Sequence, residues 1–317
     1  MTHIRVVSCG GTIASEPGSA GAAPAKSAND LLERVPSLES HATLSTVDVA
    51  SVPGFDADFD SIFAARDAID AAFEAGVDGI VVTHGTDTLA DVAFALELLC
   101  DPEGPVVVTG AQRRFDEPGS DAPSNLLTAV RAATDSSFDG TVTVAFDDEL
   151  HRARDVVKTH TNALDTFQSP GIGPVATFTR ETVRYHRPAE SDLPQFESLS
   201  FPVEASVPVL HSGVAVDSTL FDHALADADG IVIEGTGLGN VTGTLGERIA
   251  EVADETPIVV SSRCHAGPTE PVYGTPGGAV SLERAGVHFA GDLPTSKARL
   301  LLALCLASGS EPADVFE

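Results

Sequence analysis

Residues 79–109 read GIVVTHGTDTLADVAFALELLCDPEGPVVVT, and their pattern sets the expected fold class. One apolar run occupies 79–83 and a second occupies 105–109, and each has the length of one buried strand. Between them, residues 89–99 carry apolar side chains at the spacing of a helix. A strand, a helix and a second strand in this order are typical of parallel β-strands joined by a helical crossover. The stretch therefore predicts an α/β fold.

The same alternation extends in both directions from this stretch. We expect a strand at 4–8, a helix at 61–75, a helix at 124–133 and a strand at 141–146. After a break, the pattern resumes with strands at 207–211, 230–234 and 257–261 and helices at 217–226, 243–254 and 296–308. The predicted fold class is α/β, with two α/β domains built on mainly parallel sheets.

The break in the alternation falls where prolines recur among polar and acidic residues. Pro188, Pro194 and Pro202 lie in this stretch. Such a composition is typical of a linker. We therefore predict an N-terminal domain over 1–187 and a C-terminal domain over 207–317, joined by a linker over 188–206.

The composition is that of a protein with an apolar core, since 43% of the residues are hydrophobic. The apolar runs are too short to cross a bilayer, so we expect no membrane partner. The first residues pass into a glycine turn without the long apolar region of a signal peptide. These features predict a cytoplasmic protein.

The formal net charge is −29, and the lysines of the chain are Lys26, Lys158 and Lys297. This acidic surplus argues against nucleic acid as a partner, because binding phosphates requires a basic patch. Acidic residues are spread along the whole chain, which resembles a cytosolic protein of a halophile and suggests a haloarchaeal source. An unusually acidic protein of a mesophile is the alternative.

No sequence pattern points to a metal or a cofactor. The four cysteines, Cys9, Cys100, Cys264 and Cys305, are widely spaced, and three of them lie among apolar neighbours typical of buried thiols. The glycines form neither a dinucleotide-binding motif nor a P-loop, and the histidines lack zinc-protease spacing. We therefore expect neither a metal nor a cofactor.

Three polar motifs directly follow predicted strands. GGT stands at 10–12, HGTDT at 84–88 and GAQR at 110–113. In parallel α/β sheets, binding sites form at the carboxyl ends of the strands. We therefore expect the three motifs to meet at one edge of the N-terminal sheet and to form a single site.

These residues include the groups that hydrolysis of an amide needs: a nucleophile, a base and donors to the oxyanion. Thr12 lies on a glycine turn whose backbone can approach a ligand closely, and Thr86 and Asp87 lie on a second such turn. Lys158 is the candidate base, in a chain with few lysines. The sequence leaves open whether Asp87 keeps this amine charged.

Each of these residues also has an ordinary structural interpretation. GGT alone is as typical of a tight turn or a phosphate loop as of a catalytic site. Thr86 or Asp87 could cap the helix that is expected to begin near residue 89. A single lysine is usually a solvated surface charge. The combination of the motifs, rather than any one of them, favours amide hydrolysis.

Together the motifs resemble those of a known family. CGGTIA at 9–14 and HGTDTL at 84–89 resemble the two signature segments of the bacterial-type (type I/II) L-asparaginases. Further blocks similar to the family are GAQR at 110–113, DVVKT at 155–159, Gly239-Asn240 and GDLPTSKAR at 291–299. The resemblance covers nearly the whole chain.

The resemblance implies a larger N-terminal and a smaller C-terminal domain, and hydrolysis of L-asparagine to L-aspartate and ammonia. Thr12 matches the family's nucleophile, and Thr86 and Lys158 match its second threonine and its lysine. Asp87 matches the acid that also meets the α-amino group of the substrate. Asn240 matches a residue lent by a neighbouring protomer, which implies a homodimer or homotetramer with shared sites.

The residues expected to bind the amide substrate are Gly11, Gly54, Phe55, Gly85, Asp87 and Asn240. Two features depart from the family pattern. The loop at 15–27 has no tyrosine, and Ala22 or Ala23 stands near the position where the family carries one. Gly54-Phe55 replaces a polar pair that binds the α-carboxylate and amine of the substrate. The groups that break the amide are kept, whereas part of the amino-acid clamp is replaced.

Two other functions are consistent with the sequence. The ammonia-producing subunit of an archaeal tRNA amidotransferase resembles this family, but it carries an additional N-terminal domain for which the first motif at Cys9 leaves no room. A non-catalytic metabolite-binding homologue would explain the altered clamp. Release of ammonia by the purified chain alone would separate the asparaginase from both.

Overall fold

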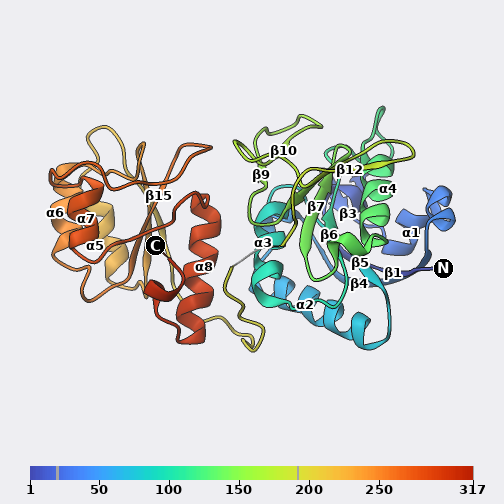
Figure 1. Ribbon diagram of the computed structural model, residues 1–317, viewed down its shortest axis with the longest axis horizontal. Coiled ribbons are helices and arrows are strands. Elements are labelled where there is room, and N and C mark those ends of the chain that lie inside the picture. Colours follow the sequence, from blue (N-terminus) through green and yellow to red (C-terminus); the bar gives the residue numbers. More distant parts are fainter. Residues whose placement is uncertain (19–20, 191–192, 317) are drawn as a thin grey trace. The chain divides into compact units, whose positions relative to one another are not determined.

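The computed structural model describes residues 1–18, 21–190 and 193–316, which form two compact units (Figure 1). Unit 1 comprises Met1–Glu197 and unit 2 comprises Ser198–Glu317. The boundary between the units falls inside the predicted linker. Each unit has its own sheet and its own apolar core. In the described part of the chain, no helix is long and apolar enough to cross a membrane.

Unit 1 is built on an eight-stranded sheet. Five neighbouring strands are parallel, in the order β4-β1-β5-β6-β7. Their bounds are β1 (His3–Gly10), β4 (Thr43–Val52), β5 (Gly79–Thr83), β6 (Val106–Thr109) and β7 (Val142–Phe146). The last three are buried along their whole length, which is why they read as uninterrupted apolar runs in the sequence. The mainly parallel sheet predicted for this half of the chain is confirmed.

Helices pack against this sheet. They are α1 (Ala28–Glu33), α2 (Phe59–Glu74), α3 (Leu89–Leu99) and α4 (Ala122–Ala133), with the short 3-10 helices η2 (Pro36–Ser40) and η4 (Ser136–Phe138). α2 begins with a capping box, in which Asp58 accepts a hydrogen bond from the backbone N–H of Ser61 and the Ser61 hydroxyl accepts one from the N–H of Asp58. α3 contacts α2, β6 and β7 and is buried almost throughout. This burial explains why its apolar residues mark its bounds so clearly in the sequence.

The strand order reverses at β1. β1 pairs with β4 on one side, and the chain then returns to pair β5 on the other side of β1. In open parallel sheets, ligands bind at such a reversal of strand order, outside the carboxyl ends of the strands. The turns that follow β1 and β5 contain residues 10–12 and 84–88. The topology therefore places the first two polar motifs next to each other.

The sequence does not predict several elements of unit 1. β4 is an edge strand whose side chains are mostly half-buried, so it lacks an apolar run. Beyond β7 the sheet continues with the short antiparallel strands β8 (Glu149–Arg152), β11 (Ala176–Phe178) and β12 (Val183–Tyr185). These strands have too few apolar residues to produce a recognisable pattern.

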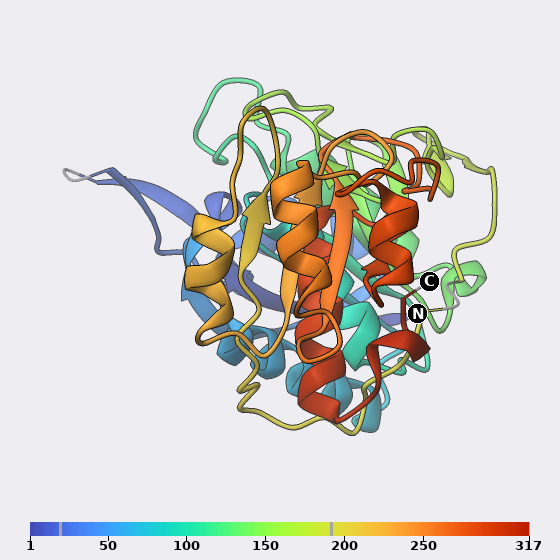
Figure 2. The same ribbon diagram turned by 90° about the vertical axis from the view of Figure 1, so that its left-hand side faces the viewer.

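Two small β-ladders stand outside this sheet. The loop expected at 15–27 contains an antiparallel hairpin of β2 (Ser15–Gly18) and β3 (Gly21–Pro24), whose blue strands extend away from the first sheet in Figure 2. A second antiparallel pair joins β9 (Val157–Lys158) to β10 (Phe167–Gln168). The second pair carries Lys158.

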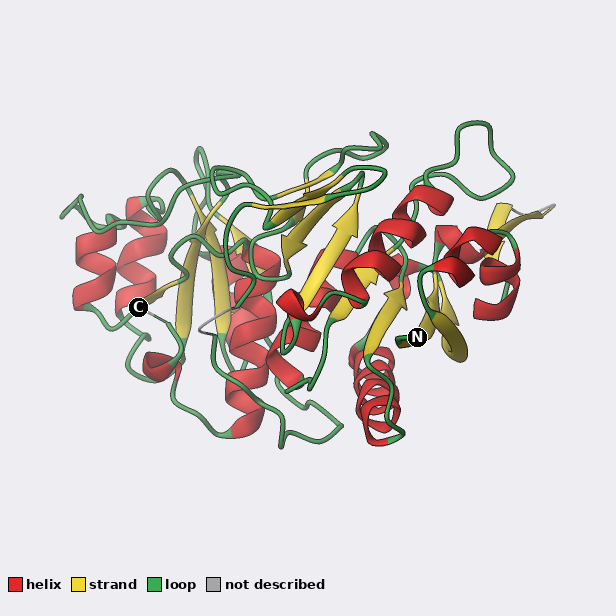
Figure 3. Cartoon of the chain, turned by 45° about the vertical axis from the view of Figure 1, so that its right-hand side comes forward, coloured by secondary structure: helices red, strands yellow, loops and turns green. Residues whose placement is uncertain are grey.

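Unit 2 contains a parallel sheet in the order β13-β14-β15-β16. Its strands are β13 (Val209–His211), β14 (Ile231–Gly235), β15 (Ile258–Ser262) and β16 (His288–Phe289). The helices that accompany them, red in Figure 3, are α5 (Thr219–Leu225), α6 (Gly243–Ala250), α7 (Ala279–Arg284) and α8 (Thr295–Ser308), followed by the 3-10 helix η5 (Pro312–Asp314). The alternation expected for this half is confirmed, and the short β16 and α7 are additions that the sequence does not reveal.

Candidate active site

Thr12 stands at the point where β1 ends in a glycine turn. Gly10 and Gly11 have φ angles of 84° and 82°, a left-handed conformation that other residues rarely adopt. The N–H of Gly11 donates to the carbonyl of Val52 at 3.1 Å, and the Ser15 hydroxyl donates to the carbonyl of Gly11 at 2.8 Å. Thr12 then begins the 3-10 helix η1 (Thr12–Ala14) and is half-buried. The turn is therefore fixed on both sides, and Thr12 has a defined position.

Three glycines bring three loops into backbone contact. A Cβ atom on Gly11 would lie 2.3 Å from the Cα of Gly85, and a Cβ atom on Gly85 would lie 2.5 Å from the Cα of Gly54. Gly54 begins the 3-10 helix η3 (Gly54–Asp56), which follows β4. Such contacts exclude any side chain at these positions. They place the loops of Thr12 and Thr86 directly against each other.

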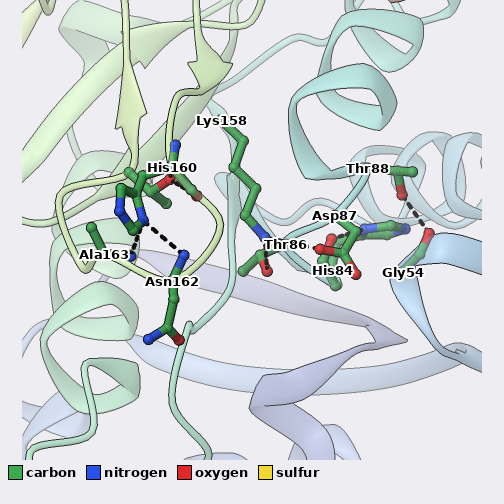
Figure 4. A network of polar contacts seen from close by, with 11 residues as sticks. Gly54, His84, Thr86, Asp87, Thr88, Lys158, His160, Asn162 and Ala163 are labelled. Atoms are coloured by element: carbon green, nitrogen blue, oxygen red, sulfur yellow. Dashed lines mark hydrogen bonds and ion pairs between the residues drawn. The ribbon is translucent and has the colours of Figure 1, made fainter.

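Lys158 joins this cluster from β9 and contacts both polar side chains of the second motif (Figure 4). Its Nζ atom donates to Oγ1 of Thr86 and to Oδ1 of Asp87, each at 2.9 Å. The Thr86 side chain is buried, the Lys158 side chain is 17% exposed, and the Asp87 side chain is 57% exposed. A threonine, a lysine and an aspartate are thus joined in one network beside the turn that follows β5.

Helix capping does not account for Thr86 and Asp87. The N-cap residue of α3 is Thr88, and its side chain makes no capping hydrogen bond. Instead, the Thr88 hydroxyl donates to the carbonyl of Gly54 at 2.6 Å (Figure 4). Thr88 therefore ties the second motif to the Gly54 turn, and the side chains of Thr86 and Asp87 remain with Lys158.

The third motif is held by an aspartate that the sequence does not single out. Asp121 accepts hydrogen bonds from the backbone N–H groups of Gln112 and Arg113, both at 2.9 Å. Asn125 donates to the carbonyl of Gly110 at 3.0 Å. The motif therefore lies in a fixed turn after β6. The signal that could have identified Asp121 is its position just before the predicted helix at 124–133.

Two titratable groups near the turns stay neutral. Burial lowers the pKa of His84, whose Nδ1 atom lies 2.9 Å from the carbonyl of Gly85. A neutral imidazole donates to this carbonyl and fixes the turn. Burial raises the pKa of the Cys9 thiol to about 12, so this cysteine is not a reactive thiolate. All four cysteines are free; Cys100 and Cys305 are also buried, whereas Cys264 is exposed.

The hydrogen bonds described for this network include neither Phe55 nor Asn240, two residues expected at the substrate. Phe55 follows Gly54, and its side chain is 69% exposed. Asn240 belongs to unit 2, in the turn after β14, and its side-chain oxygen accepts a hydrogen bond from the N–H of Ala279 at 3.1 Å. Ala279 is the first residue of α7, so Asn240 caps this helix within its own unit. The other site residues all belong to unit 1.

Two family models match nearly the whole chain. The family model described as asparaginase, N-terminal, matches residues 3–191, and the glutaminase/asparaginase C-terminal domain matches residues 206–317. The chain belongs to the asparaginase family. It is an amidohydrolase, and the Thr86–Lys158–Asp87 network lies in the part of the chain that matches the N-terminal family domain.

Individual relatives of this chain are named as L-asparaginases or as a subunit of an amidotransferase. A probable periplasmic L-asparaginase from Haemophilus influenzae is 34% identical and covers 98% of this chain and 90% of the relative. The crystal structure of a probable cytoplasmic L-asparaginase from Campylobacter jejuni superposes with a TM-score of 0.85 at 29% identity, covering 99% of this chain and 98% of the other. One of the subunits of the glutamyl-tRNA(Gln) amidotransferase from Halobacterium salinarum is 33% identical, covering 99% of this chain and 78% of that relative.

Proposed function

We propose that this amidohydrolase hydrolyses L-asparagine to L-aspartate and ammonia. One observation carries the proposal: Nζ of Lys158 lies 2.9 Å from both Thr86 Oγ1 and Asp87 Oδ1. Thr86 and Asp87 belong to a turn whose glycine, Gly85, touches the turn that contains Thr12. Two threonines, a lysine and a carboxylate on adjoining turns supply a nucleophile, a donor that orients a hydroxyl, and a group for an ammonium. Relatives named L-asparaginase support the choice of substrate.

In this proposal Thr12 is the nucleophile. Its hydroxyl oxygen attacks the side-chain amide carbon, and its proton passes to the leaving nitrogen as the C–N bond breaks. Backbone N–H groups of the turns of Thr12 and Thr86, other than the N–H of Gly11 that is bonded to Val52, stabilise the negative oxygen that forms. Ammonia leaves and an ester on Thr12 remains. A water molecule, oriented by Thr86 and Lys158, then attacks this ester, and a proton of the water passes to the Thr12 oxygen as the ester bond breaks. Asp87, which is the most exposed member of the network, meets the α-ammonium of the substrate.

The position of Gly54 explains why the polar clamp is altered. A Cβ atom there would lie 2.9 Å from the backbone of Gly85, so a hydroxyl-bearing residue does not fit without moving the turn. Each missing contact to the zwitterion costs about 1–3 kcal/mol, or roughly 5–150-fold in affinity. We therefore expect hydrolysis of L-asparagine with a high KM, and a poorer rate with L-glutamine, whose extra methylene misplaces the amide against Thr12.

Steady-state kinetics of the purified chain test this proposal. Ammonia release is measured with L-asparagine, D-asparagine, L-glutamine and a des-amino analogue of asparagine. Turnover of L-asparagine without any partner supports the asparaginase. No release from any amide favours a metabolite-binding protein or an amidotransferase component that needs its partner. A micromolar KM for L-asparagine would contradict the weakened clamp, and a preference for the des-amino analogue would indicate a less polar substrate, with Phe55 lining the pocket.

We further propose a homodimer or homotetramer whose sites are shared, with Asn240 lent by the neighbouring protomer. Two-fold dimers are the commonest closed assemblies of soluble proteins. Light scattering at high salt is expected to give at least the mass of a dimer. An active monomer would rule out shared sites.

We also propose that the protein is cytoplasmic, halophilic and of haloarchaeal origin. The support is a net charge of −29 with acidic residues spread along the whole chain. Repulsion among these carboxylates weakens the compact state in dilute buffer, and salt screens it. We expect activity and Tm to rise from low salt to about molar KCl, a range over which the screening length falls to roughly 3 Å. Equal stability in dilute buffer would contradict the halophilic interpretation.

A further inference from the structure

The position of Lys158 depends on more than the strand that carries it. β9 contains two residues, and its pairing with β10 places Lys158 opposite Phe167. An isolated two-stranded ladder of this size is marginally stable in water. Lys158 must nevertheless hold its Nζ atom 2.9 Å from two acceptors at once. The flanking segments must therefore supply the rigidity.

The segment before Lys158 is anchored by charge. The side chain of Asp155 is 2% exposed and forms ion pairs with arginine side chains. Its Oδ2 atom lies 2.8 Å from Nη2 of Arg187, and its Oδ1 atom lies 3.3 Å from Nη1 of Arg154. A buried carboxylate paired with guanidinium groups is costly to displace. On the other strand, Phe167 packs against Phe146 of β7, with ring centroids 4.6 Å apart. The chain is thus fixed on the N-terminal side of Lys158 and across the ladder.

The segment after Lys158 is closed by an imidazole. Nδ1 of His160 accepts hydrogen bonds from the backbone N–H groups of Asn162 and Ala163, both at 3.0 Å (Figure 4). Because Nδ1 is the acceptor of both bonds, its ring proton resides on Nε2. The His160 side chain thereby stabilises the turn as an Asn side chain does, whose oxygen accepts a hydrogen bond from the backbone N–H two residues further along the chain.

Thr166 completes the turn from its other end. It is fully buried, and its hydroxyl accepts from the N–H of His160 at 2.9 Å and donates to the carbonyl of the same residue. Its carbonyl accepts from the N–H of Thr159 at 2.7 Å. These bonds begin one residue after Lys158. The turn from 159 to 166 therefore closes directly onto the end of β9.

We propose that His160 is a positioning residue for Lys158. It acts through the backbone: the two bonds to Nδ1 shape the turn, the turn fixes the end of β9, and the strand directs Nζ toward Thr86 and Asp87. This inference rests on the proposed amide hydrolysis, in which Lys158 takes part. His160 itself touches none of the reacting groups, and its side chain makes these contacts on the exposed surface.

A pair of amide variants tests the proposal. In His160→Asn the oxygen on Cγ takes nearly the place of Nδ1, so the bonds to residues 162 and 163 can form. In His160→Gln the oxygen is one carbon further out, near the place of Nε2, and cannot make them. His160→Ala removes the acceptor altogether. His223→Ala, at an exposed histidine of α5, is the matched control.

We expect His160→Ala and His160→Gln to lower kcat by up to about 100-fold, since a displacement on the order of 1 Å can have this effect. KM should change less than kcat, because His160 makes no contact with the substrate. His160→Asn should recover most of kcat, and His223→Ala should match the wild type. Hydrogen exchange supplies a readout besides activity: the amides of residues 159–163 should exchange faster in the Ala and Gln variants and regain protection in the Asn variant.

The outcomes separate this inference from the proposed function. If the wild-type protein hydrolyses no amide, the proposed function is contradicted. In that case hydrogen exchange by itself still shows whether His160 shapes the turn. An active wild type with unchanged kcat in His160→Ala overturns the positioning role. The role is also overturned if His160→Asn is as inactive as His160→Gln while its turn is protected. Should His160→Ala fail to fold, the comparison of Asn with Gln still decides the question.

Discussion

Replacing Lys158 with methionine is expected to lower kcat by about 100- to 10,000-fold, the range over which a positioned acid or base contributes. Methionine fills a similar volume but lacks the Nζ donor, which lies 2.9 Å from its acceptors on Thr86 and Asp87 and joins them. The protein should stay folded, because a partly exposed ion pair of this kind adds about 0–1 kcal/mol to stability. Initial rates and a thermal melt monitored by circular dichroism measure both quantities.

Non-additivity distinguishes a working network from a set of independent residues. Thr12→Val, Thr86→Val and the double variant Thr86→Val with Lys158→Met are measured alongside Lys158→Met. If the groups act as a unit, the double variant should be little worse than either single variant. Near-normal kcat in Lys158→Met would show that this lysine does not assist the threonines. A purely capping Thr86 would instead lose about 1 kcal/mol of stability with turnover intact.

The second large effect is expected for Gly11→Ala, with Gly76→Ala as its control. Both glycines have a positive φ angle, 82° at Gly11 and 80° at Gly76. Gly11 also has a ψ angle of −174°, in a region that is essentially restricted to glycine. A Cβ atom on Gly11 would meet backbone atoms of Gly85 at 2.3 Å, whereas a Cβ atom on Gly76 meets nothing within 4 Å. Both substitutions therefore place alanine at a positive φ, which costs about 1–2 kcal/mol or more. They differ in the space available, and the backbone cost at Gly11 is the larger of the two.

We expect Gly11→Ala to push the loops of Thr12 and Thr86 apart. A shift on the order of 1 Å would reduce kcat/KM by about 100-fold. Gly76→Ala should keep wild-type kinetics, and its stability should fall only because alanine is strained at a positive φ angle. Denaturant unfolding should show a larger loss for Gly11→Ala. Equal unfolding free energies for the two variants would contradict the tight contact between Gly11 and Gly85.

The sequence predicts the buried elements well, because an element that is buried on both faces consists of an almost uninterrupted run of apolar residues. β5 and α3 show this, since their bounds are visible in residues 79–99. β4 pairs with β1 along most of its length, yet its half-exposed edge position allows polar residues and removes the apolar pattern. The hairpin of β2 and β3 is hidden for a different reason, because alanine, glycine and proline favour no strand pattern.

The candidate site follows the same division. The turns after β1 and β5 could be predicted, because parallel strands end on one edge. The contact of Lys158 with Thr86 spans 72 positions, and only the family resemblance pairs these residues before the fold is known. The packing of Gly54 on Gly85 could not be predicted, since it depends on the path of the backbone after β4. The same is true of His160, which in the sequence is an ordinary histidine in a polar loop.

The unequal burial of the four thiols offers a means of attaching probes to this chain. Maleimide reagents couple to accessible thiolates, and the buried Cys9 and Cys305 have their pKa values raised to about 12 and about 11 by burial. Cys100 is buried as well, which leaves Cys264, on the segment between β15 and α7, as the exposed thiol. A fluorophore or spin label added to the unaltered protein should therefore attach at one place, far along the sequence from the candidate site of unit 1. The native chain thus carries its own specific labelling position in unit 2, and no cysteine has to be engineered in or out.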